Sequence, residues 1–391
     1  MDKRINVTRP SLPPYGEYAG LIKEIWDNGW LTNFGPLENK LAGELKEYLE
    51  AANLTLFTNG HQALAAAVRL IAGEKAKEAG AAPHEAEIIT TPFTFISTTY
   101  SITEAGFKPV FADVDPVTYT LDPAAAERLI NEKTAAILPV HVYGTLCDTD
   151  AFEAISQRYG IPVIYDAAHC FGVRRSGRGI ASYGAASMFS FHATKAFNTI
   201  EGGAVATEDA ALAEALHAYC GFGLAGGQDA GVAGTNAKMT EFAAAMGICN
   251  LRHIGEVLEK RRAIHGIYTD VFTAGRDFDR KTGYVGELGI KLLPEQEGVD
   301  RNFAYFPVVF KDEETALAVL SALEAENVFA RRYFHPLTSS AISVRRFAPA
   351  ETPVAASISA RVLAMPFYAD LLPEEAAEIA EITVKTIERR G

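Results

Sequence analysis

Short apolar runs alternate with amphipathic stretches through most of the chain after residue 53. The runs are almost continuously apolar, which is typical of strands that are covered on both faces. We predict strands over residues 54–58, 86–91, 108–114, 135–142, 161–168, 186–192 and 202–208. Helical spacing of apolar residues lies between some of them, over residues 61–73, 123–131 and 150–160. This alternation predicts an α/β domain with a mostly parallel sheet.

The alternation weakens after about residue 255, which indicates a second unit. Further helices are predicted over residues 17–30, 37–51, 256–272, 313–328 and 373–390, and a further strand over residues 302–310. The 391 residues also exceed the ~100–200 that are typical of one domain. We therefore predict a large α/β domain over residues 1–254, with the N-terminal segment included, and a smaller α+β domain over residues 255–391.

Composition excludes several classes of function. Hydrophobic residues make up 48% and charged residues 22% of the chain, as in a soluble globular enzyme. The net charge of −13 disfavours a nucleic-acid partner, although local donors can still bind the phosphate of a small molecule. No apolar run is long enough for a membrane span or a signal peptide, so we expect a cytoplasmic protein with no membrane partner. The four cysteines form no CxxC pair and no zinc spacing, so we expect reduced core thiols and no metal site.

A turn that could bind an anion follows the first of these strands. No strand is followed by GxGxxG and no Walker sequence occurs, which disfavours the usual nicotinamide enzyme. In "LFTNGHQAL", however, Asn59, Gly60 and His61 separate a strand from a helix. Free N–H groups at a helix start make an anion site, and Gly permits close approach. An ordinary strand–turn–helix junction would have the same pattern.

The stretch "VIYDAAHCFG" places a carboxylate directly after an apolar strand. Burying Asp166 there is costly unless it is paired. It is either a helix N-cap or a carboxylate held against a cationic ring nitrogen. His169 could face the same space, or it could be a hydrogen-bonded core histidine.

A lysine in "MFSFHATKAFNTIEGGAVAT" has small and apolar neighbours. Lys195 is either a snorkelling lysine at a domain edge or a buried amine with a lowered pKa, suited to Schiff-base chemistry. We expect Gly202 and Gly203 to let the next strand approach closely. The turn, the carboxylate and the amine together match pyridoxal 5′-phosphate, which needs donors for its phosphate, an acid for its ring nitrogen and an amine for its aldehyde.

The motifs "DAAHCFG" and "SFHATKAFNTIEGG" carry a family resemblance. The sequence resembles the DegT/StrS family of sugar aminotransferases, from "GWLTNFGP" to "MPFYADL". The resemblance implies an aspartate-aminotransferase-like (fold type I) large domain, and pyridoxal 5′-phosphate that becomes pyridoxamine 5′-phosphate during turnover. It also implies that Lys195 bonds to the cofactor aldehyde, that Asp166 pairs with the pyridine nitrogen and that His169 lies beside the 3′-oxygen.

Further cofactor contacts are implied by the same resemblance. Ser190 matches a phosphate-binding serine, and Phe95 matches the aromatic residue that stacks on the ring. Asn236 in "GTNAKMTEFAAAMG" matches an asparagine that reaches the phosphate of the neighbouring subunit, which implies a homodimer with shared active sites. Its alternative is a helix cap. The family's phosphate turn is often Ser-Gly-Thr, whereas here it is Asn59–Gly60–His61, so the role of the His61 side chain is open.

The resemblance is greatest to members that make dTDP-4-amino-4,6-dideoxyglucose. It implies glutamate as amine donor and a nucleotide-linked keto-6-deoxyhexose as acceptor, with amination at C4 favoured over C3 and with dTDP, UDP or GDP as the nucleotide. His192, Tyr333 and His335 are candidate substrate residues. One alternative is a pyridoxamine-dependent sugar dehydratase, but that branch replaces the lysine with histidine. The other is a non-enzymatic sensor that keeps the fold.

Overall fold

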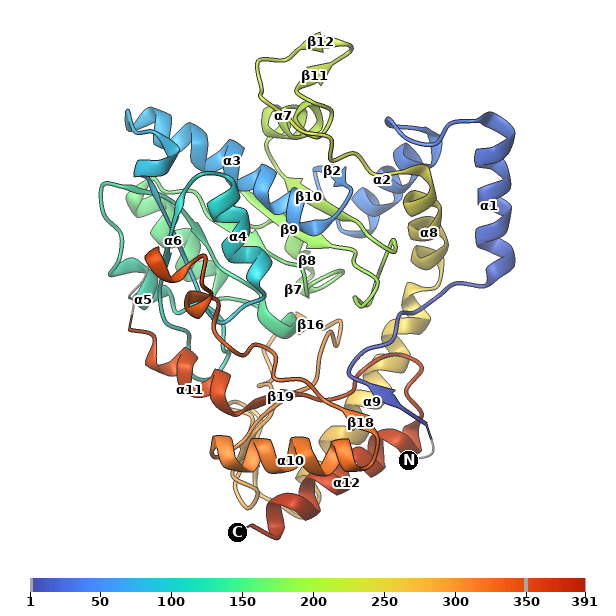
Figure 1. Ribbon diagram of the computed structural model, residues 1–391, viewed down its shortest axis with the longest axis vertical. Helices are drawn as coiled ribbons and strands as arrows, with labels where there is room; N and C mark the ends of the chain where they lie inside the picture. The colour runs from blue at the N-terminus through green and yellow to red at the C-terminus, as the bar shows by residue number, and fades with distance from the viewer. Residues whose placement is uncertain (1–2, 348–350, 391) are drawn as a thin grey trace.

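A computed structural model describes residues 3–347 and 351–390, and Figure 1 shows a larger upper part and a smaller lower part. A four-stranded sheet and a three-stranded sheet in the upper part are joined by two parallel bridges, one between Ile137 and Val163 and one between Val140 and Asp166. The strand order is β2 (Asn53–Phe57), β10 (Gly203–Thr207), β9 (Ala186–Ser190), β6 (Ile164–Asp166), β5 (Thr134–Leu138), β3 (Glu87–Thr90) and β4 (Lys108–Phe111).

The strands of this sheet run parallel, with the exception of β10. The pairs β6–β9, β3–β5 and β3–β4 are parallel, whereas β10 is antiparallel to both β2 and β9. This confirms the predicted mostly parallel sheet. The carboxyl ends of the parallel strands therefore meet at one edge, which is where ligands bind in sheets of this kind.

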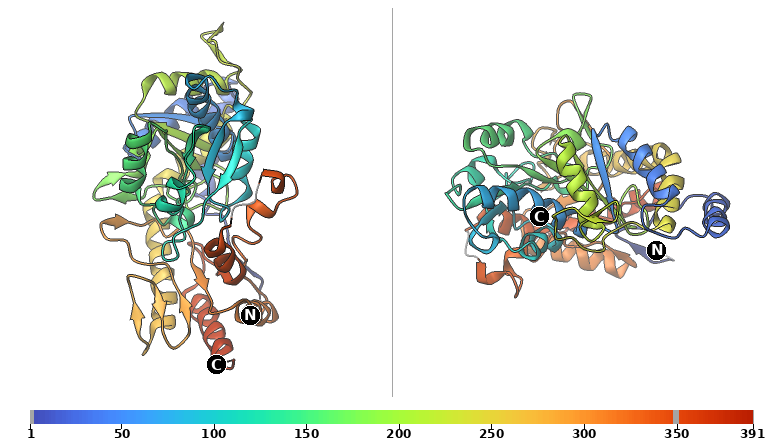
Figure 2. Two further views of the ribbon diagram at one scale, coloured as in Figure 1. Left: turned by 90° about the vertical axis from the view of Figure 1, so that its left-hand side faces the viewer. Right: turned by 90° about the horizontal axis from the view of Figure 1, so that it is seen from above.

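Helices cover both faces of the sheet (Figure 2). Val205 of β10 belongs to the apolar cluster of α3 (Gly60–Glu78), whereas its neighbours Ala204 and Ala206 belong to that of α2 (Pro36–Tyr48) and α8 (Glu241–Arg252). Successive side chains of a strand point to opposite faces, so these helices lie on opposite sides. This explains why the strands are apolar almost throughout.

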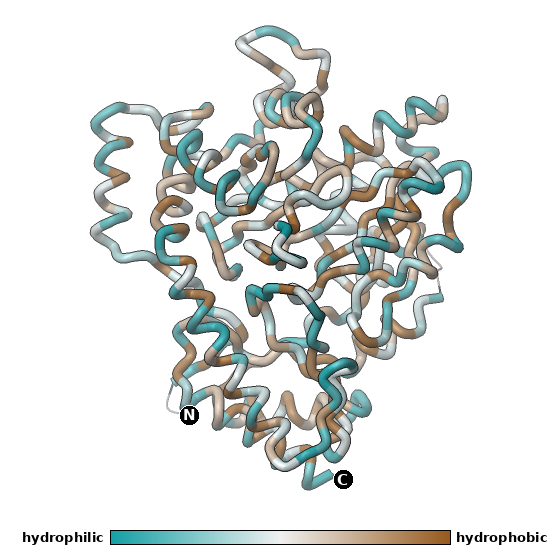
Figure 3. Tube along the Cα trace, turned by 180° about the vertical axis from the view of Figure 1, so that it is seen from behind, coloured by the Kyte–Doolittle hydropathy of each residue, from teal (hydrophilic) through white to brown (hydrophobic). Residues whose placement is uncertain are grey.

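Further helices complete the large part. They are α1 (Tyr15–Asn28), α4 (Ile96–Glu104), α5 (Pro123–Glu127), α6 (Thr149–Tyr159) and α7 (Ala210–Cys220). In Figure 3, hydrophilic and hydrophobic residues alternate along α1, which projects at the side of the molecule, and Trp26 is 71% exposed there. A hairpin of β11 (Leu224–Ala225) and β12 (Gln228–Asp229) projects from the top of Figure 1.

An antiparallel sheet organises the lower part. Its order is β13 (Phe278–Asp279), β14 (Tyr284–Val285), β15 (Ile290–Lys291), β17 (Pro307–Val309) and β19 (Val362–Ala364). The helices that accompany it are α9 (Ile254–Thr273), α10 (Glu313–Ala325), α11 (Pro353–Arg361) and α12 (Pro373–Glu388). The long helix α9 runs from the upper part into the lower one (Figure 1).

The N-terminal strand packs with the lower part. β1 (Ile5–Asn6) pairs in parallel with β18 (Val328–Phe329), and Ile5 lies in the apolar cluster of α9, α10 and α12. The sequence grouped this segment with residues 1–254, whereas its contacts link it to the C-terminal residues. The division at residue 254 stays a prediction. Among the described residues, no helix is both long and apolar enough to cross a membrane.

Candidate functional site

Three candidate side chains follow strands that end at the same edge of the sheet. Asp166 is the last residue of β6 and Ser190 the last residue of β9, and Lys195 lies in the loop that follows β9. Asn59 follows β2, which runs parallel to β9 because both are antiparallel to β10. The parallel ordering of the strands therefore gathers residues that are far apart in the sequence.

The turn before α3 packs tightly against the ends of β9 and β10. Asn59 caps α3, because its Oδ1 accepts a hydrogen bond of 2.9 Å from the Gln62 N–H. A Cβ added at Gly60 would lie 2.9 Å from Ser190 Cβ, and one at Gly203 would lie 2.6 Å from Gly60 Cα. The expected close approach of Gly203 is therefore confirmed. The first N–H groups of a helix have no partner within it, so those of Gly60 and His61 can donate to an anion.

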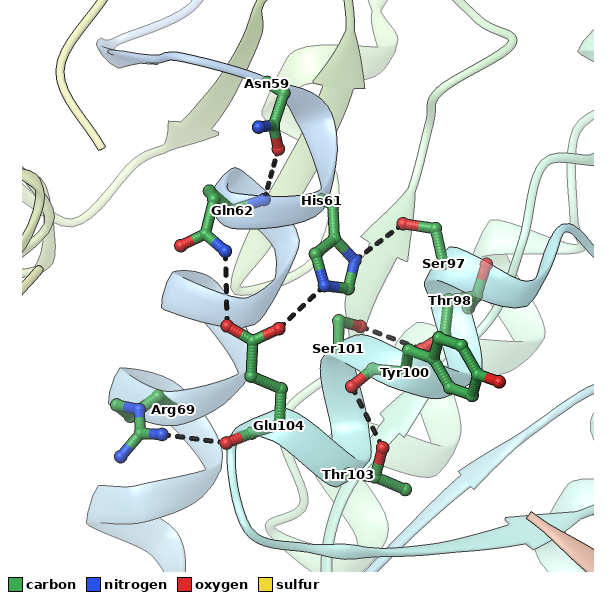
Figure 4. A network of polar contacts seen from close by, with 10 residues as sticks. All are labelled: Asn59, His61, Gln62, Arg69, Ser97, Thr98, Tyr100, Ser101, Thr103 and Glu104. Atoms are coloured by element: carbon green, nitrogen blue, oxygen red, sulfur yellow. Dashed lines mark hydrogen bonds and ion pairs between the residues drawn. The ribbon is translucent and has the colours of Figure 1, made fainter. Parts of the chain in front are cut away.

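The His61 side chain turns toward α4 (Figure 4). Its Nδ1 lies 2.8 Å from Ser97 Oγ, and its Nε2 lies 2.8 Å from Glu104 Oε2. The imidazole therefore connects two helices, while the backbone N–H of the same residue stays at the start of α3. This gives the side chain a set of contacts that the sequence did not reveal.

Asp166 is a buried carboxyl group, 5% exposed, with hydrogen bonds to both oxygens. Thr98 of α4 donates its hydroxyl to Oδ2 over 2.8 Å, and the Ala168 N–H donates to Oδ1 over 3.1 Å. Burial raises the pKa of Asp166, while these two hydrogen bonds and the charge of Lys195 act to lower it. A turn follows Asp166, so the helix-cap alternative was wrong.

His169 is buried as well, and its tautomer is set by the backbone. The Tyr143 N–H donates to His169 Nδ1 over 2.9 Å. Burial lowers the pKa of His169 well below its usual range, and the charge of Lys195 adds to this effect. A neutral ring that accepts at Nδ1 carries its proton at Nε2, where it can donate to an oxygen.

Lys195 is half-buried, which lies between the snorkelling lysine and the buried amine that the sequence left open. Its Nζ donates to the hydroxyl of Tyr305 over 3.5 Å. Its charge acts on the pKa of both Asp166 and His169, which places the amine within electrostatic reach of each. The structure thus brings the amine, the carboxylate and the imidazole into one cluster.

Two members of this cluster were missed by the sequence interpretation. Thr98 holds Asp166, and Tyr305 contacts Lys195 and lies 4.7 Å from the His169 ring, centroid to centroid. Thr98 lies three positions after Phe95 in a Ser- and Thr-rich stretch, and Tyr305 lies within an expected strand. Neither position has a local signal of function, because the partners are distant in sequence.

The residue expected to stack on the cofactor ring and the candidate substrate residues lie in different places relative to this cluster. Phe95 precedes α4 and is 54% exposed. Tyr333 lies near the cluster, with its ring 6.3 Å from that of Tyr305. The two histidines have partners elsewhere, because His335 Nδ1 is 3.2 Å from Ser359 Oγ of α11 and His192 Nδ1 is 2.8 Å from the Thr194 hydroxyl.

Asn236 lies on the surface, before α8. It forms an antiparallel bridge with Gly221, and its Oδ1 accepts a hydrogen bond of 2.5 Å from Lys238 Nζ. Thr240 is the residue that caps α8, so the helix-cap alternative for Asn236 was wrong. All four cysteines are buried and unpaired, as expected of core thiols.

These residues fit pyridoxal 5′-phosphate. The first N–H groups of α3, at Gly60 and His61, lie against Ser190 at the end of β9 and can donate to a phosphate. Asp166 offers a buried carboxylate for a cationic ring nitrogen, and Lys195 offers an amine for an aldehyde.

The sequence model of the DegT/DnrJ/EryC1/StrS aminotransferase family matches residues 16–384. This chain belongs to that family. Its members depend on pyridoxal 5′-phosphate, so the protein is a pyridoxal-phosphate-dependent sugar aminotransferase. The family resemblance drawn from the two motifs is confirmed.

Similar proteins match over nearly the full length of this aminotransferase. The dTDP-4-amino-4,6-dideoxy-D-glucose transaminase of Shigella dysenteriae is 36% identical, over 99% of each chain. The enzyme of the same name from Escherichia coli is 33% identical, over 97% of this chain and 98% of its own. The crystal structure of DesI with its TDP-sugar product has a TM-score of 0.88 and 29% identity, over 100% of this chain and 94% of that one. This likeness confirms the predicted fold type I architecture.

Proposed function

We propose that this aminotransferase moves the amino group of glutamate to C4 of dTDP-4-keto-6-deoxyglucose. The observation that carries the proposal is the full-length similarity to two transaminases named for dTDP-4-amino-4,6-dideoxy-D-glucose. The likeness to DesI, solved with a TDP-sugar product, supports a thymidine nucleotide. Amination at C3 is the alternative. The product would supply the synthesis of a cell-surface polysaccharide, such as an O-antigen, or of a secondary-metabolite sugar.

In this proposal a separate chemical role falls to each of Lys195, Asp166 and His169. When bound, pyridoxal 5′-phosphate supplies an aldehyde that accepts an amine and a ring that withdraws electrons. Lys195 Nζ would hold that aldehyde covalently and would serve as the general base and then the general acid for the proton that is moved. Asp166, fixed by Thr98, keeps the ring nitrogen protonated. Since the Tyr143 N–H donates to its Nδ1, His169 would have Nε2–H available to donate to the 3′-oxygen of the cofactor.

The other proposed residues bind rather than react. Ser190 and the N–H groups of Gly60 and His61 hold the phosphate. Phe95 stacks on the ring. We keep His192, Tyr333 and His335 as candidate substrate residues, with Tyr333 favoured because its ring lies near Tyr305.

The test is incubation of the purified enzyme with glutamate and a panel of nucleotide-linked 4-keto and 3-keto sugars. Products are identified by mass and by NMR. We expect conversion of dTDP-4-keto-6-deoxyglucose to the 4-amino sugar, with release of 2-oxoglutarate. A 3-amino product would support the alternative. Loss of the 3-hydroxyl without amine transfer would indicate a dehydratase, and no turnover of any sugar would indicate a sensor.

We further propose a cytoplasmic homodimer in which Asn236 reaches the phosphate in the partner subunit. Its exposure agrees with a contact made outside its own chain. A mixed dimer of one Lys195→Ala subunit and one Asn236→Ala subunit tests this. If Asn236 crosses the interface, both changes fall in one site and the other site keeps about half of the wild-type activity. If Asn236 serves its own subunit, both sites are damaged and activity falls well below half, provided the Asn236→Ala homodimer is itself impaired.

A further inference from the structure

The backbone N–H and the imidazole of His61 make their contacts in different directions. Its backbone N–H lies at the start of α3, next to Gly60 and the end of β9. Its imidazole leaves that site and spans Ser97 and Glu104, at 2.8 Å each (Figure 4). These two residues lie about two turns apart on one side of α4. The His61 ring therefore fixes both the position of α4 along its own axis and its orientation, relative to the start of α3.

Glu104 receives further hydrogen bonds from α3. Gln62 Nε2 donates to Glu104 Oε1 over 3.2 Å, and Arg69 donates to the main-chain oxygen of Glu104 over 2.9 Å. The carboxylate is thus held by two consecutive residues of the first turn of α3, as Figure 4 shows. The Glu104 carboxylate accepts from Nε2–H, and Nδ1 shares a hydrogen bond with the Ser97 hydroxyl. Each member of the network has a complementary partner.

The helix that His61 holds also carries a contact to the other end of the site. Thr98, next to Ser97, donates its hydroxyl to the Asp166 carboxylate over 2.8 Å. The start of α3 would bind the phosphate, and Asp166 would bind the ring nitrogen. These two groups belong to one small cofactor molecule, in which a short linker joins the phosphate to the ring and limits their separation. The spacing between α3 and α4 must therefore match the cofactor closely for both contacts to form at once.

We propose that His61 is a positioning residue for the cofactor, which sets the phosphate-binding turn of α3 in register with the Asp166-holding helix α4. This inference rests on the cofactor site in the proposed function, but not on the identity of the sugar or of the amine donor. It predicts that loss of the His61 ring contacts weakens cofactor binding even though the ring itself faces α4. If His61 only held the two helices together, loss of its ring contacts would lower the stability of the protein without changing its affinity for the cofactor.

The experiment measures the affinity of the apoprotein for pyridoxal 5′-phosphate, by fluorescence titration without glutamate or sugar. His61→Phe keeps the ring volume and removes both hydrogen bonds. His61→Gln restores a donor for Glu104 and an acceptor for Ser97. Thr103→Ala is the matched control, because Thr103 lies on the exposed side of α4 and donates to the main-chain oxygen of Tyr100. The thermal midpoint of each apoprotein reports stability separately.

We expect His61→Phe to raise the Kd of the cofactor by about tenfold, which equals ~1.4 kcal/mol. We expect His61→Gln to recover most of that affinity, and Thr103→Ala to stay within about twofold of wild type. Ser97→Ala removes one of the two bonds and should have a smaller effect, which is not additive with that of His61→Phe.

A His61→Phe apoprotein that is less stable but binds the cofactor like the wild type would overturn the proposal. If His61→Phe does not fold, the same criterion applies to Ser97→Ala. Because no sugar or glutamate is present, a wrong substrate assignment leaves this result unchanged, and failure of the two proposals is distinguishable.

Discussion

Gly203→Ala should damage both stability and cofactor binding, because the added methyl has no free space. The Cβ would lie 2.6 Å from Gly60 N and Cα and 2.7 Å from the Asn59 carbonyl carbon, against the 3.4 Å of an ordinary contact. These are backbone atoms, so no side chain can rotate away, and the start of α3 or of β10 must shift. Overpacking of this kind typically costs about 1–3 kcal/mol.

The shift also moves the N–H groups that we assign to the phosphate. One lost hydrogen bond to a charged group costs about 1.5–3 kcal/mol, which corresponds to a rise of tenfold or more in Kd. The assays are denaturant unfolding of the apoprotein and titration with pyridoxal 5′-phosphate. Gly73→Ala is the control on the same helix. A Cβ at Gly73 meets no described atom within 4 Å, and it should stabilise α3 by about 0.5–1 kcal/mol.

The reasoning would be refuted if Gly203→Ala matched the wild type in both assays, because the contact would then be looser than the distances state. Lower stability with unchanged cofactor affinity would support the steric argument, but it would contradict the assignment of the phosphate site to the start of α3. Equal losses in Gly73→Ala would show that any change on α3 has this effect.

Three further predictions concern the site and its scaffold. Lys195→Ala should abolish turnover and the visible absorbance of the bound cofactor while leaving the far-UV circular dichroism unchanged; near-normal turnover would contradict its assignment. Tyr305→Phe keeps the ring contacts but removes the hydroxyl beside Lys195, so kcat should fall by about tenfold or more with stability changed by less than ~1 kcal/mol; an unchanged kcat would make Tyr305 a packing residue. Burial and the charge of Glu241 raise the pKa of Glu38 to about 7, above its unfolded value of 4.5, so this carboxyl stabilises the fold below about pH 4.5 and that contribution is lost as the pH rises through 7. Glu38→Gln cannot ionise and should raise the free energy of unfolding by roughly 3 kcal/mol at pH 8, but by less than about 1 kcal/mol at pH 5; an equal gain at both values would exclude ionisation as the cause.

The sheet could be predicted because its strands carry their own signal. β3, β4, β6, β9 and β10 lie within the expected runs, and β2 and β5 begin one residue before theirs, since burial on both faces leaves an apolar sequence. The two-residue strands of the lower part, such as β13 and β14, had no such signal because two residues cannot show a period. The placement of β1 was not predictable either, because its partner β18 lies more than 300 residues away.

The site was predictable where one motif contains both the strand and the functional residue. Asp166 is the last residue of one strand and Lys195 lies in the loop after another, so the chemistry could be inferred from the local pattern. Their partners could not be inferred, since Thr98 and Tyr305 lie far away in sequence. The half-burial of Lys195 was missed for the same reason, because distant residues set its surroundings.

Helix α4 shows most clearly why local pattern was insufficient. Its sequence "ISTTYSITE" is rich in Ser and Thr, which are weak helix formers, and no helix was predicted there. Thr98, Thr99 and Ser101 are nevertheless buried and paired, with Thr98 bonded to Asp166 and Thr99 to Thr338. A helix of low intrinsic propensity depends on its tertiary contacts for its position. α4 should therefore respond to changes at either end, at Asp166 or at His61, and this is why a ring that faces away from the cofactor can still influence how tightly the cofactor binds.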